Sequence, residues 1–148
     1  MRNHRHAASF VFSGVAAFAL FAFASASTQA QAAVSRRDIA GTNWTLQSLA
    51  GQPINAENAP TLAFGPQYRL SGNGGCNPFF GVYGESRSND VVIRTVDAAG
   101  AQCDAPVMTQ EQTFLDILRT AHSIELEDNG VLTVTSGDGR VAQLRARQ

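Results

Sequence analysis

The sequence predicts an α+β fold, made mainly of antiparallel strands with one α-helix. From residue 41 onward, short apolar runs rich in Val, Ile, Thr and aromatic residues alternate with Gly, Pro, Asn and Asp, which is typical of strands joined by turns. Only residues 108–121 repeat their apolar positions convincingly at helical spacing. The chain has 148 residues and no internal repeat or low-complexity tract. It therefore has room for one domain.

The strands of the first half follow from apolar alternation and from turn residues. Trp44, Leu46 and Leu49 recur within residues 42–49, which predicts the first strand. Residues 51–60 contain two prolines and two asparagines and are predicted to form a loop. Four more strands are predicted at residues 61–64, 68–71, 79–83 and 90–96, the last of them rich in β-branched side chains.

The helix and the strands after it complete the predicted order. The helix is expected over about residues 108–121, where Thr109 followed by Gln112 resembles a capping box. Its apolar stripe includes Phe114, Leu115, Ile117 and Leu118. Three further strands are predicted at residues 123–127, 131–135 and 141–144, joined into two hairpins by Asp-Asn-Gly and Gly-Asp-Gly turns.

Residues 1–32 are predicted to be a secretory signal peptide. Arg2 and Arg5 precede an apolar run over residues 7–24, and A-x-A cleavage sites follow at residues 24–26 and 30–32. An uncleaved membrane anchor is the alternative, but serines and a glycine interrupt the run. We expect residues 33–40 to be a short linker. The mature protein is expected to be periplasmic or secreted, with no membrane span after signal cleavage.

Composition argues against several classes of function. The formal net charge is −1, which gives no strong electrostatic footprint for nucleic acid. The chain has no lysine, which excludes Schiff-base and Ser-Lys chemistry. Signal cleavage leaves His122 as the one histidine that could act as a base, and its place at the end of the predicted helix favours a structural role. We predict no catalytic residue, no metal site and no cofactor. An acid/base pair among Asp97, Asp104, Glu111 and Asp116 is the enzymatic alternative.

Cys76 and Cys103 are the two cysteines of the chain. In an oxidising compartment, two thiols in one small domain favour a structural disulfide. Closing a loop of about 27 residues would stabilise the fold by ~3 to 4 kcal/mol in the chain-entropy model. A redox pair, or a copper site with Met108, is the alternative. The sequence has neither the close C-x-x-C spacing of a redox pair nor the histidine cluster of a copper site.

The most unusual stretch is residues 71–81, where four glycines, two asparagines and a cysteine surround paired phenylalanines. Glycine allows positive φ and close backbone approach, so one interpretation is a loop that binds a ligand or partner. The other is a tight connection or bulge that bends strands over a core. The candidate binding residues are Asn73, Gly74, Gly75, Asn77, Phe79 and Phe80.

Several segments resemble the META domain (HslJ-like) family over residues 41–146. They are Gly-Thr-Asn-Trp-Thr-Leu at 41–46, the Gly-Gly-Cys-Asn block at 74–83, and Cys103 before a helix with Glu111 and Phe114. The terminal strand at 131–134 and the turn at 137–139 complete the pattern. The family usually has Thr and Met shortly before its second cysteine, whereas this chain has Ala-Gly-Ala-Gln at residues 99–102.

The resemblance implies a curved antiparallel sheet or open barrel with a single helix packed on it. It also implies a bacterial protein that is exported or belongs to the envelope, and some members of the family are heat-inducible. The family has no established catalytic residue that could be assigned to this chain. We expect a monomeric, non-enzymatic interaction or binding module with a stress-related role, whose partner in the envelope is a protein or small molecule. The alternative is a binder of a small apolar ligand, in a pocket lined by residues such as Trp44, Phe64, Phe79 and Phe114. An interaction module instead predicts a filled core and an exposed apolar patch.

Overall fold

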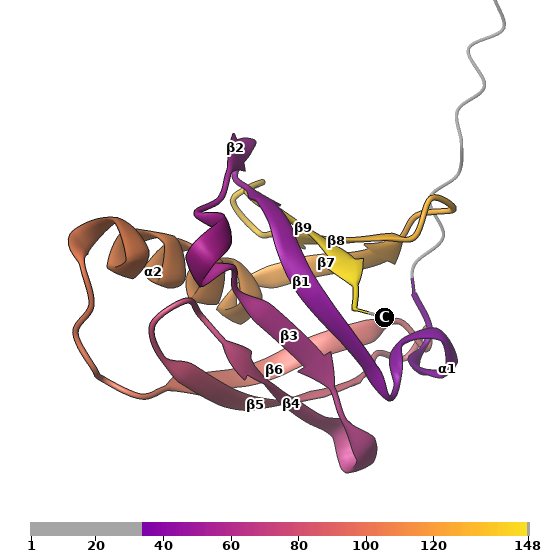
Figure 1. The fold of residues 1–148 in the computed structure, drawn as a ribbon. Helices are drawn as coiled ribbons and strands as arrows, with labels where there is room; N and C mark the ends of the chain where they lie inside the picture. Colours follow the sequence, from indigo (N-terminus) through magenta and orange to yellow (C-terminus); the bar gives the residue numbers. More distant parts are fainter. Residues whose placement is uncertain (1–33, 148) are drawn as a thin grey trace, which may run out of the picture.

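The computed structural model describes residues 34–147 as an α+β fold, as predicted (Figure 1). The predicted signal peptide, residues 1–32, lies outside the described residues. The strands are β1 (Thr42–Leu49), β2 (Gln52–Pro53), β3 (Thr61–Phe64), β4 (Arg69–Asn73), β5 (Pro78–Glu85), β6 (Val91–Ala98), β7 (Ala121–Leu126), β8 (Val131–Ser136) and β9 (Val141–Ala146). The helices are α1 (Arg36–Ile39) and α2 (Ala105–Arg119), with 3₁₀ turns η1 (Ala56–Asn58) and η2 (Pro66–Tyr68).

One antiparallel sheet contains every strand of the described chain. Its order is β6-β5-β4-β3-β1-β9-β8-β7, and the short β2 pairs with β1. The sheet curls until its two end strands, β6 and β7, lie next to one another without pairing. The result is a nearly closed, barrel-like sheet with α2 packed against it, chiefly on β6 and β8 (Figure 1).

Two glycines permit a close approach between the backbones of β4 and β5 and their neighbouring strands. A Cβ atom at Gly72 would lie 2.0 Å from the carbonyl oxygen of Thr61, and one at Gly81 would lie 2.0 Å from that of Thr95. No other residue fits at either position, because real Cβ atoms do not approach an oxygen so closely. A register shift between Val82 and Tyr83 adds a bulge to the pairing of β5 with β6, which increases the local twist.

Alternate strand positions and one side of α2 fill the interior of the barrel. Trp44 lies in this core with 3% of its surface exposed, which agrees with a packing role. The rings of Phe79 and Phe114 meet edge to face with centroids 6.1 Å apart, and those of Phe64 and Tyr83 do so at 5.2 Å. The first pair therefore joins β5 to α2, and the second packs within the sheet, between β3 and β5.

The helix begins and ends earlier than predicted. It starts at Ala105, so Pro106 lies inside its first turn, where the missing N–H of proline costs no hydrogen bond. Thr109 is already helical, and its hydroxyl donates to the carbonyl of Ala105 instead of capping the helix. The helix ends at Arg119, because the chain then enters β7, and His122 therefore lies in a strand.

Residues 34–40 differ from the linker that we expected. They contain α1, and their two large apolar side chains are buried, Val34 being 3% exposed and Ile39 fully covered. The sequence did not indicate this because two apolar residues five positions apart show neither helical nor strand periodicity. The predicted loop at residues 51–60 likewise contains β2 and η1.

Candidate functional site

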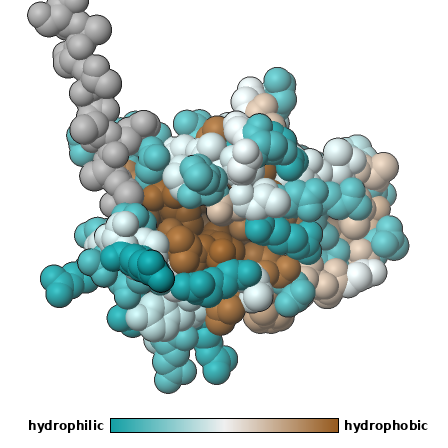
Figure 2. Space-filling model, turned by 180° about the vertical axis from the view of Figure 1, so that it is seen from behind, coloured by the Kyte–Doolittle hydropathy of each residue, from teal (hydrophilic) through white to brown (hydrophobic). Residues whose placement is uncertain are grey.

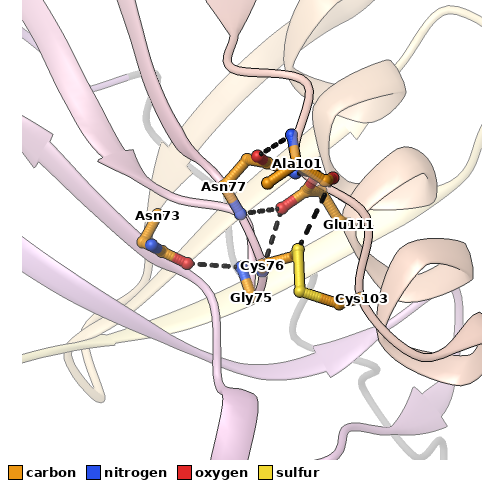
Figure 3. The surroundings of a disulfide bond; sticks show 7 residues. All are labelled: Asn73, Gly75, Cys76, Asn77, Ala101, Cys103 and Glu111. Carbon is orange, nitrogen blue, oxygen red and sulfur yellow. Dashed lines mark hydrogen bonds between the residues drawn. A yellow bond between two sulfur atoms is a disulfide. The ribbon is translucent and has the colours of Figure 1, made fainter.

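The Gly/Asn loop between β4 and β5 closes around the carboxylate of Glu111, on α2 (Figure 3). The backbone N–H groups of Cys76 and Asn77 donate to Oε2 of Glu111 at 3.0 and 2.6 Å. The side-chain amide of Asn77 donates to Oε1 at 2.7 Å. Glu111 is 3% exposed, and no cation pairs with it in the described chain. Its charge is thus balanced by N–H dipoles alone.

Glycine is required where this loop touches the carboxylate. A Cβ atom at Gly74 would lie 2.6 Å from Cγ of Glu111, and Gly75 has φ +120°, a value that other residues rarely adopt. The side chain of Asn73 accepts a hydrogen bond from the N–H of Gly75 at 2.7 Å and so holds the turn. The glycines of this stretch therefore serve the approach of loop to helix.

The disulfide predicted between Cys76 and Cys103 is present in the structure, with Cα atoms 6.0 Å apart. Next to it, the side chain of Asn77 exchanges two hydrogen bonds with the backbone of Ala101, at 3.0 and 2.8 Å (Figure 3). Both bonds use main-chain atoms of residue 101, so the departure from the family pattern at residues 99–102 leaves them in place. Together they tie the loop to the segment that leads into α2.

A second clamp lies one residue earlier on α2. The carboxamide of Gln110 accepts from the N–H of Asn55 at 2.8 Å and donates to the carbonyl of Asn58 at 2.9 Å. Sequence reasoning did not identify Gln110. It named Glu111 as a candidate acid or base and as part of the family pattern, without a role in holding the loop. The available signal was the position of Glu111 on the same helix face as Phe114, Leu115 and Leu118, where a charge is unusual.

The candidate binding residues separate into two groups. Gly74, Asn77 and Phe79 are buried, and Asn73 and Gly75 are half-buried. They form the connection around Glu111 and the adjoining core. Phe80 alone presents a large side chain to solvent, with 66% of its surface exposed. The structure therefore assigns most of the loop to packing.

An apolar face lies on the outside of β5 and β6, and we call it the β5 face. It is made by Phe80 and Val82, which is 40% exposed, with Thr95, Asp97 and Ala98 on β6. These residues line an open hollow of about 560 Å³. Ser71 and Arg69 of β4 stand opposite Phe80 and Val82 in the sheet, so polar groups border the apolar pair.

The carboxylates considered as an acid/base pair have different surroundings. Asp97 and Asp104 are exposed, and Asp116 pairs with Arg119 at 3.3 Å on the surface of α2. Both oxygens of Glu111 accept the hydrogen bonds described above. Among residues 34–147 no three His, Cys, Asp or Glu side chains are grouped to hold a metal ion. The disulfide also removes both thiolates from the copper site considered with Met108.

One carboxyl group in the described chain has a shifted titration. The hydroxyl of Ser136 donates to Asp138, and this contact is the main reason that the pKa of Asp138 falls from 3.8 to about 2. Hydrogen bonds from the backbone and side chain of Arg140 lower it further. This group lies in the turn between β8 and β9, apart from the β5 face.

The comparisons with known proteins agree with this geometry. The model of the META domain family matches residues 37–148. The chain belongs to the META domain family. The resemblance noted in the sequence is therefore confirmed, and with it the α+β fold.

Two solved structures share the fold of this META domain. The NMR structure of a protein from Burkholderia xenovorans is 17% identical, with a TM-score of 0.62 over 76% of this chain and 86% of that chain. A second NMR structure is 18% identical, with a TM-score of 0.58 over 74% of this chain and 93% of the other. At such identities the likeness shows the fold alone. The curated proteins contain no match.

The helices of this META domain are short. Within the described residues, none has the length and apolar character needed to cross a membrane.

Proposed function

We propose that this META domain is an exported, non-enzymatic interaction module of the bacterial envelope, and that it binds a protein partner on the β5 face. The observation that carries the proposal is an exposed apolar pair, Phe80 and Val82, on the outside of a sheet whose other face buries the core side chains. The four side chains that would line an internal ligand pocket are each at most 3% exposed. The rings of Phe64, Phe79 and Phe114 each pack edge to face on another ring, which supports a packing role for them and favours a surface site.

The chemistry of the β5 face suits a protein partner. Phe80 is a large aromatic side chain on a rigid strand, and such anchors contribute much of the energy of protein interfaces. The neighbouring Asp97 is exposed and has no ion pair in the described chain, so it is free to attract a cation. We infer a partner segment that places an apolar side chain beside Phe80 and a basic one beside Asp97.

Three features support export and a role in the envelope. The sequence begins with a basic and apolar leader that ends in small-residue cleavage sites. The Cys76–Cys103 disulfide is compatible with an oxidising compartment. Heat-inducible members of the resembled family support a stress-related role.

The engagement of both oxygens of Glu111 supports a structural use of the one buried carboxylate in the described chain.

Site-specific photocrosslinking tests this proposal in cells. A benzoylphenylalanine at position 80 keeps the aromatic character, and the same group at Gln112, on the exposed side of α2, is the matched control. We expect a discrete protein adduct from position 80 and none from position 112. Adding Val82→Asp should abolish the adduct while the melting temperature stays close to that of the parent.

Two outcomes would contradict the proposal. Adducts of equal yield from positions 80 and 112 would mean that contact is not specific to the β5 face. In native mass spectrometry, the Val82→Asp variant could instead carry a reproducible extra mass of small-molecule size. That result would favour the ligand-binding alternative.

A further inference from the structure

The gap between β6 and β7 is bridged by the first residues of the described chain. Val34 donates its N–H to the carbonyl of Ile124 in β7 at 3.2 Å and accepts from the N–H of Val91 in β6 at 3.1 Å. Ser35 adds an antiparallel bridge to Asp90, just before β6. We call residues 34–40 the strap and the gap that it bridges the seam. The strap thus takes the place of a strand between the two ends of the sheet.

The strap is held by burial as well as by hydrogen bonds. Val34 and Ile39 belong to the hydrophobic core. The hydroxyl and N–H of Ser35 both donate to the carboxylate of Asp38, at 2.6 and 3.2 Å, which keeps α1 wound. The guanidinium of Arg36 lies 4.5 Å from the ring centre of Tyr68. The seam therefore holds Val34, the helical turn that follows it and the buried side chain of Ile39.

The rest of the seam carries part-exposed apolar groups. Ile93 on β6 and Leu126 on β7 are partly buried and pack against the core. Toward α2, the side chain of Arg119 donates to the carbonyl of Val96 at 3.1 Å and covers that end of β6. Figure 2 shows an apolar area close to the point where the described chain begins. Without the strap, the edges of β6 and β7 would lose the hydrogen bonds that Val34 makes to Val91 and Ile124.

We propose that the seam is a strand-acceptor site, that its own strap occupies it in the monomer, and that the strap of a second copy occupies it when the first is displaced. The strap is joined to β1 through Gly41, which has φ +81° and whose N–H donates to the carbonyl of Phe64 at 2.6 Å; as a glycine it can adopt the other backbone conformations that displacement of the strap requires. A second copy presents the same Val34, Ser35 and Ile39, so exchange reforms every contact. Exchange of an identical terminal segment is a low-cost route to a dimer.

Residues 34–36 lie before the region that the family model matches, which begins at residue 37. The contacts of Val34 with both sheet edges therefore lie outside the family pattern. The proposal is independent of the β5 face, since none of its residues belongs to that surface.

Peptide binding to the full mature chain tests the acceptor site. A fluorescent peptide of residues 33–40 is added to the wild type, to Val34→Asp and to Ala40→Asp, which places the same charge on an exposed residue of the strap. Val34→Asp should release the strap and bind the peptide at least about tenfold more tightly than the other two proteins. The same peptide carrying Asp in place of Val34 should not bind. A natively folded Val34→Asp protein that ignores the peptide would overturn the proposal.

Two measurements on the wild type decide the matter if Val34→Asp does not fold. In hydrogen exchange, the amides of Val34 and Val91 should exchange together and well before amides paired within the sheet; their exchange only on global unfolding would refute displacement of the strap. Mixing ¹⁴N and ¹⁵N copies at high concentration should give mixed dimers by native mass spectrometry. Monomers alone at every concentration would refute the exchange.

Discussion

The buried carboxylate of Glu111 offers the sharpest test of how the fold is held together. It accepts two main-chain hydrogen bonds and one from the amide of Asn77. In Glu111→Gln the new carboxamide has one oxygen and one NH₂ group. If the oxygen faces the N–H groups of Cys76 and Asn77, the NH₂ group faces the NH₂ of Asn77, and two buried donors oppose each other.

The structure sets the size of the effect. One hydrogen bond to a charged group is lost, which is worth roughly 1.5–3 kcal/mol, and one buried donor is left unsatisfied at roughly 1–3 kcal/mol. Partial rotation of the side chain reduces the sum, so we expect the free energy of unfolding to fall by about 3 kcal/mol. A small domain has roughly 5–15 kcal/mol in total, so the variant should unfold at much lower urea concentration.

The assay follows the fluorescence of Trp44 in urea, since this single tryptophan is buried and changes environment on unfolding. Asp116→Asn is the control on the same helix, because the side chains of its ion pair with Arg119 are 42% and 53% exposed. We expect that control to lie within about 0.5 kcal/mol of wild type. Equal stability of Glu111→Gln and Asp116→Asn would refute the argument that the carboxylate organises the loop.

Two further predictions concern the disulfide and a surface turn. Cys76→Ser should lower the free energy of unfolding by ~3 to 4 kcal/mol, because it opens a loop that spans 27 residues. A reducing agent should lower the free energy of unfolding of the wild type by the same amount. An unchanged urea midpoint would show that the disulfide does not stabilise the fold. The pKa of Asp138 is lowered to about 2 in the folded protein. The ionised carboxylate therefore stabilises the fold above pH 3.8, and this contribution is lost as the pH falls toward 2. In an NMR titration, Ser136→Ala should move this pKa back toward 3.8, because it removes the main cause of the shift; a midpoint unaffected by the substitution would assign the shift to Arg140.

Much of the secondary structure follows from local patterns. Residues 42–49 and 61–64 were predicted as strands, and β1 and β3 have the same bounds. Alternation and turn residues act over a few positions, so the sequence carries them directly. The predicted helix begins at residue 108 and α2 at Ala105, because Pro106 fits within the first turn of the helix, where proline needs no hydrogen-bond partner.

The composition of residues 71–81 indicated that this loop is unusual, but it did not indicate that the loop surrounds Glu111. Phe79 and Phe80 are adjacent and identical in type, yet one is fully buried and the other is 66% exposed. Strand geometry requires that they point to opposite faces, but only the pairing of β5 with β4 and β6 decides which face meets the core. Glu111 and the loop that surrounds it are more than thirty positions apart, beyond the reach of any local pattern.

By itself, the sequence predicted eight of the nine strands of the described chain, the single long helix, the pairing of Cys76 with Cys103 and membership of the META domain family. The tertiary structure alone decided that residues 34–40 close the barrel and that Glu111 is a buried anchor. The physical reason is that strand and turn preferences are local. Closing the sheet instead joins Val34 to Val91 and Ile124, which only the curl of the whole sheet brings together.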